Sequence, residues 1–139
     1  MRLFVDTNVL IDVLANRKDF YADSSAIWTL AESGRSEAAI AMISISNCYY
    51  VIRKHGGRKN ADQAIRLLRD TFQAVDLTTQ ILNQAIDADF TDFEEALQYF
   101  SATHARADYF ITRNPNHFPQ GTLPIMTPRE FLAAFPSES

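Results

Sequence analysis

Several acidic and amide side chains of this 139-residue chain lie at the expected ends of strands or starts of helices. The fold could bring such positions together at one edge of a sheet. Asp6 directly follows the apolar run Leu3-Phe4-Val5, and Asn8 stands two residues after it. Three further acids lie where a helix is expected to begin: Asp92, Glu94 and Glu95. Such oxygen ligands suit a hard cation such as Mg²⁺. The three histidines stand singly and Cys48 is the only cysteine, so the sequence has no zinc-type spacing.

Asp6 has two interpretations that its own segment leaves open. Residues 2–5 are predicted to form a buried strand, and a helical apolar pattern begins directly after it at Val9. An acid between a strand and a helix lies at the carboxyl edge of a sheet, where open α/β sheets bind ligands. Asp and Asn are also common helix caps, so Asp6 or Asn8 fits a capping role equally well.

The rest of the chain must position these acids, and its apolar patterns predict strands that alternate with helices. The expected strands are residues 2–5, 38–43, 73–77, 108–112 and 124–126. The expected helices are residues 9–16, 22–33, 47–54, 61–71, 78–87, 91–104 and 128–135, with the last three residues frayed. This alternation predicts an α/β fold with a mostly parallel sheet covered on both faces.

Composition limits the class of protein. With 47% hydrophobic and 22% charged residues and only four glycines, we expect a single globular domain over residues 1–139. A single cysteine fits a reducing cytoplasm, and the short apolar start resembles neither a signal peptide nor a membrane helix.

Charge is unevenly distributed along the chain. Six of the thirteen basic residues fall between Arg53 and Arg69, and no basic residue stands between Asp70 and Ala105. Three basic residues before and after a Gly-Gly turn are candidates for contact with a nucleic-acid backbone: Arg53, Lys54 and Arg58. A solvated helix face explains the same residues at least as well.

Polar residues also follow two other apolar runs. Ser44, Ser46 and Asn47 come after the second expected strand, and Thr112, Arg113 and Asn114 after the strand at 108–112. Because carboxyl ends of parallel strands share one edge, we expect these side chains to meet Asp6 there.

Four segments of the sequence together resemble a PIN domain, of the small bacterial kind that includes VapC-type toxins of toxin–antitoxin pairs. The segments stand in the family's order and span nearly the whole chain: LFVDTNVLIDVL, ISISNCYYVIRK, DFEEALQYFSA and ADYFITRNPNHF. The resemblance implies a three-layer α/β/α sandwich around a parallel sheet. It also implies RNA cleavage that depends on Mg²⁺ or Mn²⁺, a small antitoxin partner, and a homodimer.

The resemblance assigns roles to particular residues. Asp6 and Glu95 match acids that hold the metal, and Asp92, one helical turn before Glu95, is the auxiliary acid. Asn8 matches the polar residue that supports the first acid. In an active metal-dependent nuclease, further polar residues would help to fix metal ligands and waters by hydrogen bonds: Asn47, Thr112 and Asn114. Arg113 is a candidate for binding a phosphate of the RNA, although a surface loop arginine explains it equally well.

Two departures from the family pattern leave an alternative open. Asn47 stands where most PIN nucleases have a glutamate, and Asn114 and His117 stand where an acid usually follows the strand. Fewer carboxylates should weaken cation binding. The leading expectation is therefore a metal-dependent endoribonuclease toxin, and the alternative is a catalytically impaired PIN domain that binds RNA or protein.

Overall fold

The computed structural model describes residues 1–136, so the three terminal residues expected to be frayed lie outside the described part. Five strands are present: β1 (Arg2–Val5), β2 (Glu37–Ala41), β3 (Gln73–Val75), β4 (Tyr109–Ile111) and β5 (Ile125–Met126). The helices are α1 (Thr7–Leu14), α2 (Tyr21–Glu32), α3 (Met42–Thr71), α4 (Thr79–Asp87), α5 (Phe93–His104), the 3₁₀ turn η1 (Pro115–His117) and α6 (Pro128–Ala134). Within residues 1–136, no helix is long and apolar enough to cross a membrane.

The five strands form one parallel sheet in the order β3-β2-β1-β4-β5. The chain moves outward from β1 through β2 to β3, and then returns to place β4 on the other side of β1. The strand order therefore reverses between β1 and β4. In open α/β sheets the carboxyl side of this reversal is the usual ligand site.

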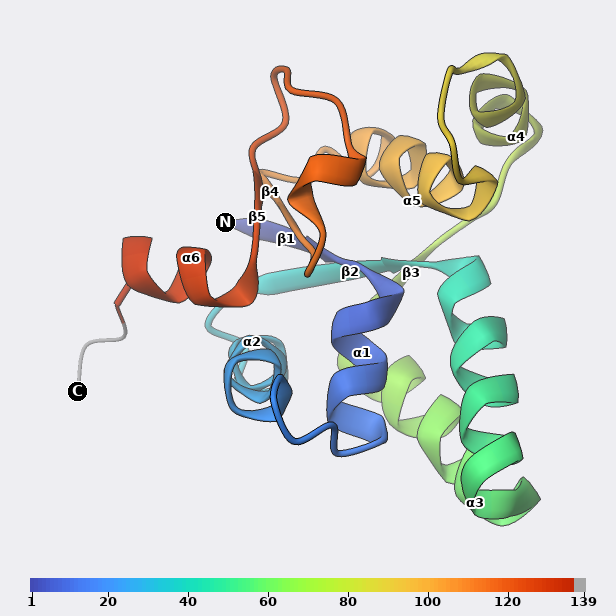
Figure 1. Ribbon diagram of the computed structural model, residues 1–139, viewed down its shortest axis with the longest axis vertical. Helices are drawn as coiled ribbons and strands as arrows, with labels where there is room; N and C mark the ends of the chain where they lie inside the picture. The colour runs from blue at the N-terminus through green and yellow to red at the C-terminus, as the bar shows by residue number, and fades with distance from the viewer. Residues whose placement is uncertain (137–139) are drawn as a thin grey trace.

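Alternate residues of the strands enter two separate cores. Leu3, Val5 and Ile40 pack beneath α1, α2, α3 and α6, whereas Phe4 and Phe110 pack against α5 on the other face. Figure 1 shows α1, α2, α3 and α6 on one side of the sheet and α4 and α5 on the other. The predicted three-layer α/β/α class is confirmed.

The boundary after β2 differs from the prediction. The strand ends at Ala41 and α3 begins at Met42, so residues 42–46, expected as strand and connection, are helical. A continuous apolar run has no period that separates a buried strand from a buried helix, and the prediction extended the strand too far.

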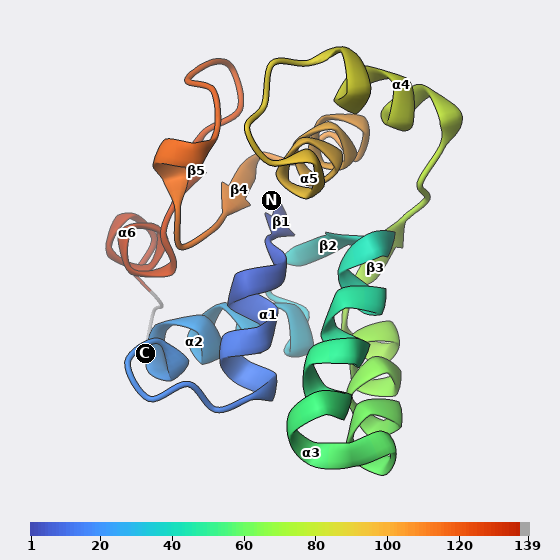
Figure 2. The same cartoon turned by 45° about the vertical axis from the view of Figure 1, so that its right-hand side comes forward.

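The long helix α3 turns back on itself at a glycine. Gly57 has φ 85°, which L side chains rarely adopt, and the helical backbone is interrupted there. The predicted stop at His55-Gly56-Gly57 is confirmed, and Figure 2 shows the two halves of α3 lying side by side. The first half begins at the carboxyl edge of β2, and the bend lies at the far end of the molecule.

Candidate active site

Asp6 lies at the point where the strand order reverses. Its backbone N–H donates to the carbonyl of Ile111 in β4 at 2.9 Å, and only 3% of the residue is exposed. Its Oδ2 accepts a hydrogen bond from Thr112 Oγ1 at 2.7 Å. Asp6 occupies the N-cap position of α1, but its side chain makes no capping hydrogen bond of good geometry. The carboxylate thus faces the strand ends.

Thr112 organises the polar residues around Asp6. Its hydroxyl gives its one proton to Asp6 and accepts hydrogen bonds from Asn8 Nδ2 at 3.4 Å and from the Asn114 backbone N–H at 3.1 Å. The Arg113 backbone N–H donates to Asn8 Oδ1 at 3.3 Å. Asn8, Thr112 and Asn114 are therefore brought together with Asp6, and the Asn114 contact is made through its backbone.

The start of α5 brings the other acids to this edge. Asp92 is the N-cap residue, and its Oδ1 accepts the Glu95 backbone N–H at 3.0 Å. Glu95 Oε2 lies 2.9 Å from His117 Nδ1. Glu94 Oε1 accepts a long hydrogen bond of 3.4 Å from Thr7 Oγ1. Asp92 is exposed, whereas Glu94 and Glu95 are partly buried.

The pKa values of two of these acids show that their charges interact. Burial raises the pKa of Asp6, the negative charge of Glu95 adds to this, and the Thr112 hydroxyl, the Gln98 amide and the Asn8 backbone oppose it. Burial also raises the pKa of Glu94, as do the charges of Asp92 and Asp6. The strongest groups that oppose these increases are hydroxyls and amides, so the carboxylate cluster carries excess negative charge.

The comparisons with known proteins can be set against this geometry. A family model described as PIN domain matches residues 2–116. The chain belongs to the PIN domain family. No protein among the curated sequences matches it significantly.

Solved structures of toxins and toxin–antitoxin complexes share the fold of this PIN domain. A toxin–antitoxin complex from Klebsiella pneumoniae is 21% identical with a TM-score of 0.67, over 92% of this chain and 98% of the other. VapBC2 from Rickettsia felis, bound to a promoter DNA fragment, is 14% identical with a TM-score of 0.67, over 90% and 97% of the two chains. VapC20 from Mycobacterium tuberculosis, a toxin that cleaves the sarcin–ricin loop, is 12% identical with a TM-score of 0.64, over 78% and 86%.

Asn47, which stands where most PIN nucleases have a glutamate, lies beside Glu94. The Asn47 amide lowers the pKa of the Glu94 carboxyl, but among residues 1–136 its buried Nδ2 makes no hydrogen bond of good geometry. Ser44 Oγ lies 2.7 Å from Thr7 Oγ1, which itself donates to Glu94. We call the edge of the sheet that carries Asp6, Asp92, Glu94 and Glu95 the acidic edge. The first turns of α3, which contribute Ser44 and Asn47, therefore belong to the acidic edge of this PIN domain.

Two residues of this site, Glu94 and Gln98, were not assigned a role from the sequence. Glu94 was predicted only as an acid in the first turn of a helix, and no prediction was made for Gln98. Gln98 is 2% exposed, and its Oε1 accepts the Thr7 backbone N–H at 3.1 Å. The signal was the spacing, because residues 94, 95 and 98 share one face of a helix at steps of three and four.

The four predicted RNA-binding residues lie in two places. Arg53, Lys54 and Arg58 are exposed and flank the bend of α3. Arg113 is at the acidic edge, but its Nε lies 3.1 Å from Asp12 Oδ2 and its guanidinium stacks 4.1 Å from the centre of the Phe20 ring.

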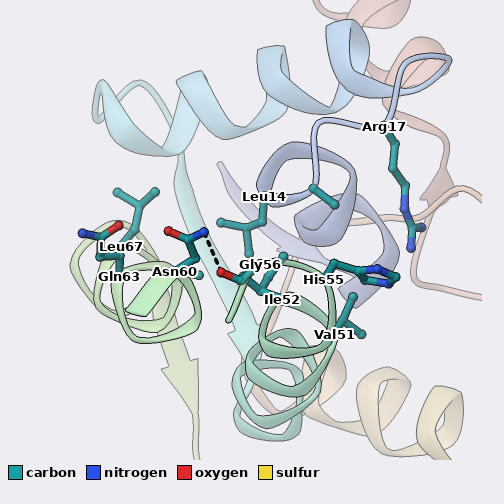
Figure 3. A pocket seen from close by; sticks show the side chains of 11 residues that line it. Leu14, Arg17, Val51, Ile52, His55, Gly56, Asn60, Gln63 and Leu67 are labelled. Atoms are coloured by element: carbon teal, nitrogen blue, oxygen red, sulfur yellow. Dashed lines mark hydrogen bonds between the residues drawn. The ribbon is translucent and has the colours of Figure 1, made fainter. Parts of the chain in front are cut away.

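A groove of about 630 Å³ lies away from the carboxylates, between the end of α1 and the two halves of α3. Leu14, Ile52 and Leu67 form apolar parts of its wall. Figure 3 shows this groove, with Asn60 Nδ2 donating to the carbonyl of Gly56 across it. No acidic residue lines it. The acids instead share an edge of the sheet.

The acidic edge has the donor set of a hard divalent cation. Burial and the charge of Glu95 raise the pKa of Asp6, and burial and the charges of Asp92 and Asp6 raise the pKa of Glu94, which a nearby cation would relieve. Among residues 1–136, no group of three or more Asp, Glu, His or Cys side chains is placed so that it could hold a metal ion. A cation at this edge would therefore be held by fewer than three of these side chains and would keep positions for water or substrate.

Proposed function

We propose that this PIN domain is an endoribonuclease that requires Mg²⁺ or Mn²⁺ and serves as the toxin of a toxin–antitoxin pair. The observation that carries the proposal is the placement of Asp6, Glu94 and Glu95 at the edge where the strand order reverses, with raised pKa values for Asp6 and Glu94. Acids whose pKa values are raised by burial and by a neighbouring charge are candidates for a functional site.

Asp6 and Glu95 would hold the cation, with Asp92 as the auxiliary acid. A bound Mg²⁺ or Mn²⁺ supplies an acidified water and a polarised phosphoryl oxygen. Thr112 holds the Asp6 carboxylate in place, since its only proton is donated to Oδ2. Asn8 and the Asn114 backbone in turn orient the Thr112 hydroxyl.

Glu94 compensates for the missing glutamate at position 47. The Glu94 carboxylate lies beside Asn47. It is also close enough to Asp6 for the negative charge of Asp6 to raise the pKa of Glu94. A carboxylate with a raised pKa accepts a proton more readily, so Glu94 is suited to take a proton from an attacking water. Asn47 would hold Glu94 in place through its amide.

RNA would reach the acidic edge along the exposed basic residues near the bend of α3. Arg53, Lys54 and Arg58 would contact phosphates, and binding would then weaken as salt concentration rises. We also propose a small antitoxin as the partner, because structural relatives from Klebsiella pneumoniae and Rickettsia felis are toxin–antitoxin complexes. We further propose that the protein acts in the cytoplasm and that it forms a homodimer.

Removal of the metal directly tests whether the protein cleaves RNA in a metal-dependent reaction. Purified protein is incubated with a structured RNA and with Mg²⁺, Mn²⁺ or EDTA, and products are resolved on a denaturing gel. We expect cleavage with either metal, none with EDTA, and recovery when metal is added in excess. RNA binding without cleavage under every condition would instead support the impaired binding module.

Replacement of Thr112 by valine should shift the pH dependence of cleavage. The variant removes the hydrogen bond that most strongly lowers the Asp6 pKa, so that pKa rises further. Since cleavage needs the ionised carboxylate, the acidic limb of the pH–rate profile should move to higher pH. Loss of such a supporting bond typically costs 10- to 100-fold, and we expect about 10-fold at neutral pH.

The matched control for this change is Thr103→Val on α5. Thr103 is exposed and its Oγ1 donates only to the carbonyl of Phe100 within its own helix. We expect the control to retain the wild-type pH profile. An unshifted acidic limb in Thr112→Val would show that this hydroxyl does not govern the charge of Asp6.

A further inference from the structure

A small pocket lies between the start of α2 and the start of α6, and we call it the α2–α6 pocket. Its volume is about 310 Å³, and its wall includes Asp19 and Phe20 before α2, Arg113 after β4 and Thr127 before α6. Figure 1 shows α2 and α6 next to each other on the same side of the sheet. Sites for small ligands begin at about 300 Å³, so this pocket suits one small group rather than an extended ligand.

The α2–α6 pocket lies at the same edge of the sheet as Asp6. Val5, Ile111 and Met126 are paired in register across β1, β4 and β5, so Asp6 and Thr127 follow the sheet at the same level. Neighbouring strands are about 4.8 Å apart, which places these two residues about 10 Å from each other. Stacked nucleotides of one strand are about 3.4 Å apart. An RNA strand with a phosphate at Asp6 can therefore place a base about three nucleotides away in the pocket.

Phe20 gives the α2–α6 pocket an aromatic surface that is held in place. The Arg113 guanidinium lies 4.1 Å from the centre of the Phe20 ring, and Arg113 is itself paired with the buried Asp12. The residue nevertheless remains 42% exposed. Proteins bind unpaired bases of RNA by stacking them on aromatic rings of this kind. Phe20 is thus suited to stack on a base, and Arg113 supports the ring.

Asp19 supplies the pocket with a carboxylate that has no partner in the described part of the chain. The other acid of the wall, Asp23, is paired with Arg129 at 3.2 Å. Within residues 1–136, the Asp19 side chain makes no hydrogen bond and no ion pair. An ionised carboxylate has two oxygens that only accept hydrogen bonds. The pocket therefore combines a stacking surface with a free acceptor pair.

We propose that the α2–α6 pocket binds an unpaired guanine of the RNA, within about three nucleotides of the bond that is cleaved. Phe20 stacks on the base, and the Asp19 carboxylate accepts the guanine N1–H and N2–H₂. This inference rests on the proposed function for its substrate. Guanine presents two neighbouring donors on one edge, whereas adenine, cytosine and uracil present a donor beside an acceptor, which a carboxylate cannot satisfy.

The pocket extends the path proposed for the RNA. The basic residues near the bend of α3 follow β2, which lies on one side of β1, and the pocket lies beyond β4 on the other side. A strand that crosses the acidic edge would thus have phosphates bound on one side of Asp6 and a base bound on the other. Base contacts give specificity, and phosphate contacts give position.

Two variants and two matched controls test the assigned roles. Asp19→Asn replaces one acceptor oxygen by a donor, and Glu32→Gln removes one charge from the other end of α2. Phe20→Leu keeps an apolar side chain beside Arg113 but removes the aromatic face, and Phe135→Leu does the same at the end of α6. All four side chains are at least partly exposed, so the fold should persist, which circular dichroism checks.

Binding is measured with Asp6→Asn present in every protein, so that the RNA is not cleaved. The probes are short single-stranded RNAs of uridines with one central guanosine, inosine or adenosine, and binding is followed by fluorescence anisotropy. We expect guanosine to bind about 10-fold more tightly than adenosine, with inosine, which lacks the N2 amino group, between them. Asp19→Asn should abolish this preference, and Phe20→Leu should weaken guanosine and inosine probes alike by about 10-fold.

The affinity ratio distinguishes base recognition from general charge. Glu32→Gln changes the net charge as Asp19→Asn does, so both can alter the affinity for every probe, but only Asp19→Asn should change the ratio of guanosine to adenosine. Equal affinities for the two probes, or a preference that Asp19→Asn retains, would overturn the guanine pocket. Free GMP that binds as tightly as the guanosine RNA would instead make it a nucleotide site and overturn its role in reading RNA.

Cleavage separates this inference from the proposed function. The otherwise unchanged protein is incubated with a pool of random RNA, and the cut ends are sequenced. We expect guanine to be enriched within about three nucleotides of the cut, and Asp19→Asn to lose the enrichment. Cleavage without enrichment overturns the pocket and leaves the nuclease intact. A guanosine preference in binding that Asp19→Asn abolishes, with no cleavage under any metal, supports the pocket and overturns the nuclease.

Discussion

The Asp6→Asn variant is expected to lose RNA cleavage by about 100- to 1,000-fold while remaining at least as resistant to heat as the wild type. The loss follows because Asp6 is the buried carboxylate of the acidic edge, and a metal's contribution to a barrier is several kcal/mol. Asparagine has nearly the same shape and still offers an oxygen to Thr112 Oγ1. The change therefore removes charge without removing the hydrogen bond.

The expected effect on stability follows from the raised pKa of Asp6. A folded-state pKa above the ordinary value of 3.8 means that the folded protein binds this proton more tightly than the unfolded chain. The contribution of this group to stability is then fully present below pH 3.8 and is lost as pH rises through the raised pKa. Above that raised pKa the wild type carries the cost of this buried charge, and the asparagine variant carries none.

Asp108→Asn is the matched control, because Asp108 lies at the opposite end of the same sheet. Its Oδ2 accepts the Arg2 backbone N–H at 2.7 Å, a hydrogen bond that joins the residue before β4 to the first residue of β1. Cleavage rates and thermal unfolding midpoints are compared for the three proteins at pH 7. If Asp6→Asn cleaves RNA as well as Asp108→Asn does, Asp6 is not a catalytic acid.

The fold was predictable because each element has a strong local signal. The apolar runs at residues 2–5 and 108–112 are too short for helices and are followed directly by polar residues. Both form strands, and their carboxyl ends bring Asp6 and Thr112 within 2.7 Å of each other. The sequence could not define the end of β2, because Met42 and Ile43 continue its apolar run into a helix.

The site was predicted only in part, because its details depend on side chains that meet across the sheet. Two consecutive acids at 94 and 95 face the same edge, and choosing between them requires the rotation of α5 about its axis. That rotation is set by packing, and it puts Glu94 near Thr7 and Glu95 near His117. Family resemblance pointed to Glu95 alone. Likewise, no local pattern reveals that Arg113 pairs with Asp12.

Arg113→Met is expected to destabilise the protein by about 2–3 kcal/mol, since it leaves a buried charge with weaker partners. The Asp12 side chain is fully buried, and Arg113 Nε is 3.1 Å from its Oδ2. Among the residues that the structure describes, Ser24 Oγ at 3.1 Å and Arg17 Nη1 at 3.6 Å then remain as the polar side-chain partners of the carboxylate. Chemical denaturation at several pH values measures the loss.

The pH dependence of this loss has a defined sign. Burial already raises the pKa of Asp12, and Arg113 is the strongest group that opposes the increase. Its removal raises that pKa further, so the variant's stability should decline over a wider range as pH rises above 3.8. The difference from wild type should be small near pH 4 and should grow as pH rises. A second change, Asp12→Asn, should restore part of the stability that Arg113→Met loses, because it removes the unpaired charge.

Arg53→Met provides the control, because Arg53 is exposed near the bend of α3 and substitutions at such sites change stability by less than about 0.5 kcal/mol. RNA affinity of Arg113→Met is compared with that of the otherwise unchanged protein, both with Asp6→Asn present, so that binding is followed without cleavage. If Arg113→Met is as stable as Arg53→Met but binds RNA far more weakly than the otherwise unchanged protein, then Arg113 acts mainly on the RNA. The expected converse, lost stability with nearly unchanged affinity, would make Arg113 the residue that holds α1 to the end of β4.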